Sequence, residues 1–197
     1  MAVGLLYSGG TDSTLAAILL DPVCEVTLLG CTFGVTDDYE HAREAARAVG
    51  FPFQRVDLEE SVAHEAIEEM VADGYPRNGI QMVHEHALER AASLAFDAVA
   101  DGTRRDDRVP RVERSLAQSI EDRHDVAHLA PLAGIGRGAI DALAEAHLTV
   151  ETGPSETLPT GDYEAELRAL LAEEYGPGRV AEIFPAHTQS RVTGRKQ

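Results

Sequence analysis

Residues 3–13 read VGLLYSGGTDS, an apolar run that meets two glycines and then enters a segment rich in alanine and leucine. The apolar run predicts a buried strand, and the following segment predicts a helix. A strand that turns into a helix through glycine brings the helix N-terminus, with its unpaired amides and positive dipole end, to the end of the strand. The stretch therefore predicts a loop that binds an anion.

The residue types of this loop fit a phosphate group. Glycines let the backbone approach a ligand closely, and hydroxyl side chains add donors. The Walker motif is excluded because no glycine precedes a lysine, and the dinucleotide fingerprint is excluded because the two glycines are adjacent. The candidate binding residues are Ser8, Gly9, Gly10, Thr11, Asp12 and Ser13.

Strand-like and helical patterns alternate along the chain, which predicts an α/β fold with a doubly wound parallel sheet and helices on both faces. We expect one nucleotide-binding domain over 1–150 and a C-terminal helical extension over 151–197, packed on the same domain and ending in an irregular tail after 184. The strands are expected at 3–7, 26–33, 51–58, 96–103 and 125–132. The helices are expected at 13–20, 36–50, 59–74, 80–95, 109–123, 137–147 and within 161–184.

The composition of the chain indicates the cellular environment and the kinds of partner to expect. The net charge is −17, and Lys196 is the only lysine among seventeen basic residues, a pattern typical of organisms with a salt-rich cytoplasm. Acidity usually argues against nucleic-acid partners, but at molar salt the Debye length is about 3 Å, so RNA stays open. No apolar run reaches membrane-spanning length and no signal peptide is expected, which predicts a cytoplasmic location.

The loop at 8–13 resembles the Ser-Gly-Gly-x-Asp-Ser signature of the PP-loop ATP pyrophosphatase superfamily, also called adenine nucleotide alpha hydrolase-like. Two further segments are similar to that superfamily: DGTRRDD at 101–107 and LAPLAGIGRGAI at 129–140. The second is closest to the tRNA-modifying and deazaguanine nitrile synthase branches. The resemblance implies a five-stranded Rossmann-like sheet of order 3-2-1-4-5, with ATP and Mg²⁺ bound where strands one and four end.

The resemblance also implies a role for each matching residue. Ser8, Gly9, Gly10 and Ser13 would hold the pyrophosphate half of ATP, and Gly102 and Thr103 would lie behind the α-phosphate. The expected adenosine contacts are Cys31, Thr32 and Phe33. The expected Mg²⁺ ligands are Asp12, Asp106 and Asp107, and the expected catalytic residues are Asp12, Asp106, Arg104 and Arg105.

Five arginines cluster within this acidic chain, which leaves two interpretations open. They could contact RNA or the departing pyrophosphate. Alternatively, they could pair with the carboxylates interleaved among them. The cluster consists of Arg104, Arg105, Arg108, Arg111 and Arg114.

The function that this implies is adenylation of a substrate oxygen, with release of pyrophosphate and then AMP, in tRNA base modification. The acceptor would be a tRNA or a small carboxylate, and a second protein could donate sulfur or ammonia; a homodimer is also open. One alternative is a stress-protein-like sensor that binds ATP or AMP without turnover. Another is the ATPase subunit of an amidating complex.

Two other features are harder to assign. His84 and His86 lie two apart on an expected helix, so they face different directions and suit surface or packing roles. The tail PAHTQSRV could be disordered, or it could fold over the active site with His187 and Arg191 reaching the substrate.

Overall fold

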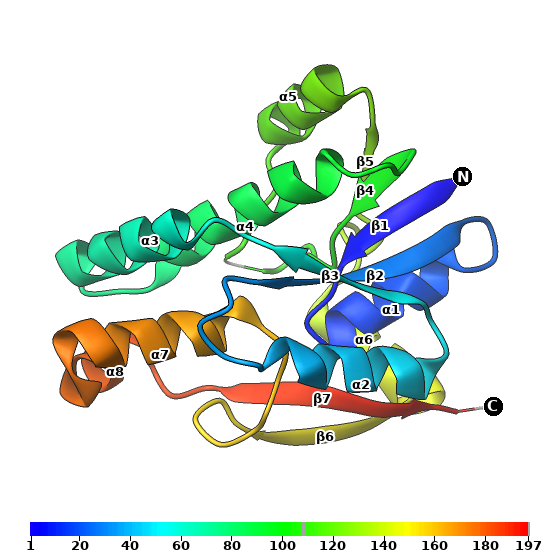
Figure 1. Cartoon of the computed structure of the whole chain (residues 1–197). Helices are drawn as coiled ribbons and strands as arrows, with labels where there is room; N and C mark the ends of the chain where they lie inside the picture. Colours follow the sequence, from blue (N-terminus) through cyan, green and yellow to red (C-terminus); the bar gives the residue numbers. More distant parts are fainter. Residues whose placement is uncertain (108, 197) are drawn as a thin grey trace.

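The structure, a computed structural model, describes residues 1–107 and 109–196. Five strands form one fully parallel sheet in the order β3-β2-β1-β4-β5, which confirms the expected fold class and strand order. Figure 1 shows helices on both faces of this sheet. The strands are β1 (Ala2–Leu6), β2 (Glu25–Thr32), β3 (Phe53–Asp57), β4 (Ala98–Ala100) and β5 (Ala127–Leu129).

Eight helices follow or connect these strands within the described residues. The expected closing segment forms two helices, α7 and α8. The helix expected from 109 begins only at 114, because Pro110 interrupts it and Glu113 is extended. The helices are α1 (Thr11–Leu20), α2 (Tyr39–Val49), α3 (Glu60–Asp73), α4 (Arg77–Ala92), α5 (Arg114–His124), α6 (Arg137–His147), α7 (Tyr163–Tyr175) and α8 (Pro177–Ile183).

Side chains alternate across the sheet and build two hydrophobic clusters. Val3 and Leu5 of β1 pack with α1, α2 and α6, whereas Leu6 packs on the opposite face with α3, α4 and α7. This period of two follows from strand geometry. Both faces are apolar because helices cover both, as in parallel sheets generally. In the described part of the chain, no helix is both long and apolar enough to cross a membrane.

The C-terminal segment corrects the prediction of an irregular tail. Thr188–Arg195 forms strand β7, which pairs antiparallel with β6, Leu148–Pro154. This two-stranded sheet lies beside α2 (Figure 1), and the Val192 amide donates to the Gly9 carbonyl at 2.9 Å. In β7 only Val192 is buried, so the strand shows no apolar alternation that a sequence pattern could reveal.

Candidate functional site

The loop 8–13 joins β1 to α1 at the carboxyl end of the parallel sheet. Gly9 turns the backbone with a φ of +81°, where other side chains are disfavoured. The N-cap residue of α1, Gly10, has no side-chain cap. Among the described residues, the Asp12 and Ser13 amides have no acceptor. These two amides are therefore available to an anion at the helix N-terminus.

A second loop, 102–107 after β4, packs directly on the first. A Cβ added at Gly102 would lie 2.8 Å from the Ser13 nitrogen, so glycine is required for this approach. Before it, the buried Asp101 accepts hydrogen bonds from the Thr103 amide and from His128 Nε2, each at 2.8 Å. Burial acts to raise the pKa of Asp101, but the His128 hydrogen bond and the neighbouring donors hold it below its usual value. The two loops thus meet at one site, anchored by a buried carboxylate.

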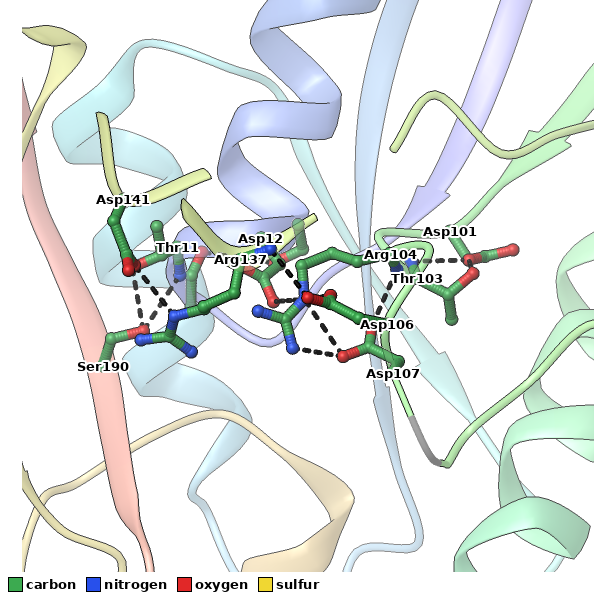
Figure 2. A network of polar contacts seen from close by, with 12 residues as sticks. Thr11, Asp12, Asp101, Thr103, Arg104, Asp106, Asp107, Arg137, Asp141 and Ser190 are labelled. Atoms are coloured by element: carbon green, nitrogen blue, oxygen red, sulfur yellow. Dashed lines mark hydrogen bonds and ion pairs between the residues drawn. The ribbon is translucent and has the colours of Figure 1, made fainter. Parts of the chain in front are cut away.

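Three carboxylates surround the Arg104 guanidinium between these loops (Figure 2). Arg104 Nε lies 3.2 Å from Asp12 Oδ2 and 3.7 Å from Asp106 Oδ1, and its Nη2 contacts Asp107 Oδ1. Desolvation raises the pKa of Asp12, although Arg104 opposes this. The Arg137 amide, which donates to Asp106 at 2.9 Å, lowers the pKa of Asp106.

These carboxylates are the expected Mg²⁺ ligands, and the structure brings them together around a cation that is part of the chain. Within the residues that the structure describes, no three His, Cys, Asp or Glu side chains are grouped as a metal site. The oxygen donors are of the type that Mg²⁺ prefers. As the side chains stand, however, Arg104 occupies the position between Asp12 and Asp107.

A cavity of about 270 Å³ extends from the two loops to α4 and the start of α7. The lining from loops 8–13 and 102–107 is polar, and the rest includes apolar side chains of β1 and β2, an imidazole and a phenol. The lining residues include seven of the predicted site residues: Ser8, Asp12, Ser13, Cys31, Gly102, Thr103 and Asp107. The others are Leu6, Tyr7, Leu29, His84, Val109, Pro110, Gly161, Asp162 and Tyr163.

The far end of this cavity carries little charge at neutral pH. Burial raises the pKa of the Cys31 thiol to about 12, so it stays protonated and acts as a small apolar group. Burial also lowers the pKa of His84, which favours the neutral imidazole. Asp162 is the exception, because its pKa is raised to about 6 by desolvation and it ionises below neutrality.

At the end of β2, a buried carboxylate binds several of the donor groups. The buried Glu166 of α7 accepts from Thr32 Oγ1 and from the Phe33 amide, both at 2.9 Å, and from the Val35 amide at 3.0 Å. Thr32 and Phe33 are not among the residues that line the cavity. Of the three expected adenosine contacts, only Cys31 borders it, since a carboxylate already occupies the donors of the other two.

Of the remaining arginines of the cluster, the three that the structure describes do not line the cavity. Arg105 is exposed beside Gly136, and the Arg111 amide donates to a glutamine of α4 at 2.8 Å. Arg114 is exposed at the start of α5, and Arg108 lies outside the described residues. The pairing interpretation thus holds for Arg104, which is surrounded by carboxylates.

The two-stranded sheet of β6 and β7 contacts loop 8–13 through a residue that was not predicted. Ser190 Oγ accepts from the Thr11 amide at 3.2 Å and from Thr11 Oγ1 at 2.8 Å (Figure 2). Arg191 instead pairs with Glu44 on α2, and His187 lies on the carbonyl of Pro185. Neither residue is among those that line the cavity, and the segment is an ordered strand from Thr188 on.

Two further residues of the site were missed, and each leaves a signal in the sequence. Glu166 lies on the face of α7 formed by Leu167 and Leu170, where an acidic residue has no solvent. His84 lies on the buried face of α4 beside Val83. A charged or polar side chain on the apolar face of a helix marks a buried interaction, although the pattern does not identify its partner.

Comparison with known proteins adds one family and one close structural relative. The model of the family of unknown function DUF7411 matches residues 1–194. Uncharacterized protein MJ0690 of Methanocaldococcus jannaschii is 38% identical over 199 residues, which cover 100% of this chain and 98% of that protein. A crystal structure from the same organism, described as a predicted subunit of tRNA methyltransferase, superposes with a TM-score of 0.89 at 36% identity, covering 100% of this chain and 98% of that one.

A weaker likeness extends to the U34-tRNA thiolase NcsA of Methanococcus maripaludis, with a TM-score of 0.48 and 17% identity over 91% of this chain and 69% of that one. The match to the DUF7411 model covers both loops of the cavity, the five-stranded sheet, and the β6–β7 pair up to residue 194. The identity to the methanogen protein extends over the same length. This chain therefore belongs to the DUF7411 family.

Proposed function

We propose that this protein is a PP-loop ATP pyrophosphatase that adenylates a substrate oxygen. The observation that carries the proposal is the meeting of loops 8–13 and 102–107 at one cavity, at the carboxyl end of a sheet whose order is β3-β2-β1-β4-β5. In such sheets ligands bind at this edge. The sequence signature of the first loop and the sheet order come from independent observations and support the same assignment.

In the proposed reaction, a substrate oxygen attacks the α-phosphorus of ATP. The bond from that phosphorus to the oxygen bridging to the β-phosphorus breaks, and pyrophosphate leaves with the electron pair. A second nucleophile then displaces AMP from the adenylated substrate. The Asp12 and Ser13 amides bind the departing phosphates, and Thr103 lies behind the α-phosphate. With no lysine in the loop to reach the γ-phosphate, charge is best stabilised on the β,γ pair.

Mg²⁺ would neutralise phosphate charge during this reaction. Asp12, Asp106 and Asp107 offer it hard oxygen ligands, and they already surround a single cation, the Arg104 guanidinium. Arg104 released from these carboxylates would carry its charge to the leaving pyrophosphate. We assign Arg104 that role and give Arg105 only a supporting one, because Arg105 is exposed.

As the acceptor we propose a tRNA, with a partner protein in the cytoplasm supplying the nucleophile. The relative described as a predicted subunit of tRNA methyltransferase supports both the substrate class and the partner. We also propose a salt-rich setting, which the single lysine and the net charge of −17 support. If it is correct, the melting temperature rises as KCl is raised to about 2 M.

The test is a product analysis. Protein, α-labelled ATP and Mg²⁺ are incubated with and without total archaeal tRNA, and the labelled products are separated by chromatography. We expect AMP, with pyrophosphate as the unlabelled product, and faster release with tRNA. ADP as the main labelled product would overturn the assignment.

A second candidate is a sensor that binds ATP without turnover. It is favoured by one observation: Arg104 already neutralises the carboxylates that a metal would need. Tight ATP binding with no labelled product under any of these conditions would support the sensor.

A further inference from the structure

His84 holds a polar atom that the protein itself does not satisfy. The residue lies on α4 and is 5% exposed, and it lines the cavity that the phosphate loop also lines. Its Nδ1 lies 3.0 Å from the Tyr163 hydroxyl. Its Nε2 is buried and has no hydrogen-bond partner among the described residues. A buried unpaired polar atom beside a cavity indicates a ligand that pairs with it.

The contact with Tyr163 determines what that atom offers. If the Tyr163 hydroxyl donates to Nδ1, the imidazole proton sits on Nε2 and one buried donor is left unpaired. If Nδ1 donates instead, both the phenol proton and the Nε2 lone pair are left unpaired. The first arrangement leaves fewer unpaired groups and is the more stable. This arrangement leaves the Nε2 proton of His84, a residue that lines the cavity, without a partner among the described residues.

The surroundings of this donor fit an uncharged aromatic ring. Leu6, Leu29 and Cys31 line the same cavity, and the Cys31 thiol is protonated. A ring held between such side chains needs one or two hydrogen bonds to fix its orientation. At the end of β2, the Phe33 and Val35 amides cannot supply them because Glu166 occupies both.

We propose that His84 is the residue that recognises the base of the bound nucleotide, by donating from Nε2 to a ring nitrogen of the purine. This inference rests on the proposed function, which places the phosphates of the same nucleotide on loop 8–13. His84 and Tyr163 come from α4 and α7, so base recognition is shared between the α/β sheet domain and the C-terminal extension.

The experiment measures binding by calorimetry for ATP, for its 1-deaza, 3-deaza and 7-deaza analogues, and for inorganic tripolyphosphate. The wild-type protein should bind one deaza analogue about tenfold more weakly than ATP, since one hydrogen bond to a buried donor is lost. His84→Leu should bind ATP about tenfold more weakly and no longer distinguish the analogues. His84→Gln, which keeps an N–H near the Nε2 position, should recover part of the affinity.

Tripolyphosphate, which has no base, should bind all variants equally. His86→Leu is the matched control, because His86 contacts Glu59 rather than the cavity and should behave as wild type. A wild-type protein that binds all three deaza analogues as tightly as ATP would overturn the inference, whether or not His84→Leu folds. Unchanged discrimination in His84→Leu would also overturn it while the proposed function stands. Failure of the wild type to bind ATP or tripolyphosphate would overturn the proposed function and this inference together.

Discussion

The two ends of the cavity hold different kinds of polar group. At the loop end, three carboxylates share the guanidinium of Arg104, although its buried Nη1 has no hydrogen-bond partner among the described residues. At the far end, the neutral pair of His84 and Tyr163 leaves one donor unpaired. The carboxylates around Arg104 are partly exposed, so a metal ion could replace the guanidinium at modest cost in free energy. The buried Nε2 donor of His84, in contrast, is satisfied only when a ligand in the cavity accepts from it. The carboxylates at the loop end would favour the exchange of one cation for another, and the unpaired His84 donor at the far end would favour one particular occupant.

The strongest test of the charged end is Asp12→Asn. The change keeps the shape of the side chain and removes one negative charge beside the phosphate loop. We expect turnover of ATP to AMP to fall by about a hundredfold or more, the usual scale for losing one electrostatic contribution to a phosphoryl transition state. The melting temperature should change little, because desolvation already disfavours this carboxylate. Asp37→Asn, at an exposed position, should keep full turnover. Equal turnover in the two variants would contradict a role for Asp12.

The exchange of cations is tested by Arg104→Gln. Removing the guanidinium leaves three carboxylates facing one another, which should cost about 2 kcal/mol and lower the melting temperature by about 4–8 °C at neutral pH. Millimolar Mg²⁺ should restore much of this loss, while the wild-type melting temperature responds little. Arg105→Gln is the control, since Arg105 is exposed and should show neither effect. If Mg²⁺ stabilises Arg104→Gln no better than the wild type, the carboxylates are not a cation site.

At the end of the cavity near His84, the variant Asp162→Asn tests whether an ionised buried carboxylate destabilises the fold. The pKa of Asp162 is raised from 3.8 to about 6, so the folded protein keeps this proton over a pH range in which the unfolded chain has lost it. Stability therefore falls as pH rises from about 4 to 6 and stays lowered above that. Asparagine still caps α7 but does not ionise. We expect a gain of about 2 kcal/mol at pH 8 and none below about pH 4, measured by urea unfolding. A variant less stable than wild type at pH 8 would refute the ionisation cost.

The smallest effect is expected for Ser190→Ala, which acts on the outer side of the loop. The Thr11 amide and hydroxyl would each lose their acceptor, but water can reach this partly exposed position. We expect a loss of about 1 kcal/mol in urea unfolding and at most a severalfold change in tripolyphosphate affinity. Ser119→Ala on the exposed face of α5 should change neither. Complete loss of tripolyphosphate binding would instead make Ser190 part of the phosphate site.

The sheet could be predicted because its sequence follows simple periods. Short apolar runs alternate with helical patterns, and the resemblance of loop 8–13 to the PP-loop signature implied the strand order, with β1 at the centre. The antiparallel pairing of β6 with β7 could not be predicted in this way. β7 is held by pairing with β6 and by the contact of Val192 with Gly9, and these interactions involve backbone groups that every sequence has.

The residues of the candidate site also fall into two groups, those that the sequence predicts and those that it does not. Ser8, Ser13 and Gly102 follow from local motifs, because glycine and hydroxyl residues at a strand end predict a phosphate loop. Glu166 and His84 depend on tertiary contacts, since each acts on a segment far away in sequence. Their positions on apolar helix faces show that they are buried, but only the fold shows which groups they reach.

The bond between Thr11 and Ser190 spans 179 positions of the chain. During synthesis, β1 and the phosphate loop leave the ribosome long before β7 does, and domains acquire structure as the chain emerges. Loop 8–13 is therefore synthesised long before β7, the strand that covers its outer side. A nascent chain that stops before residue 188 lacks β7, and with it the contacts that Ser190 and Val192 make with loop 8–13.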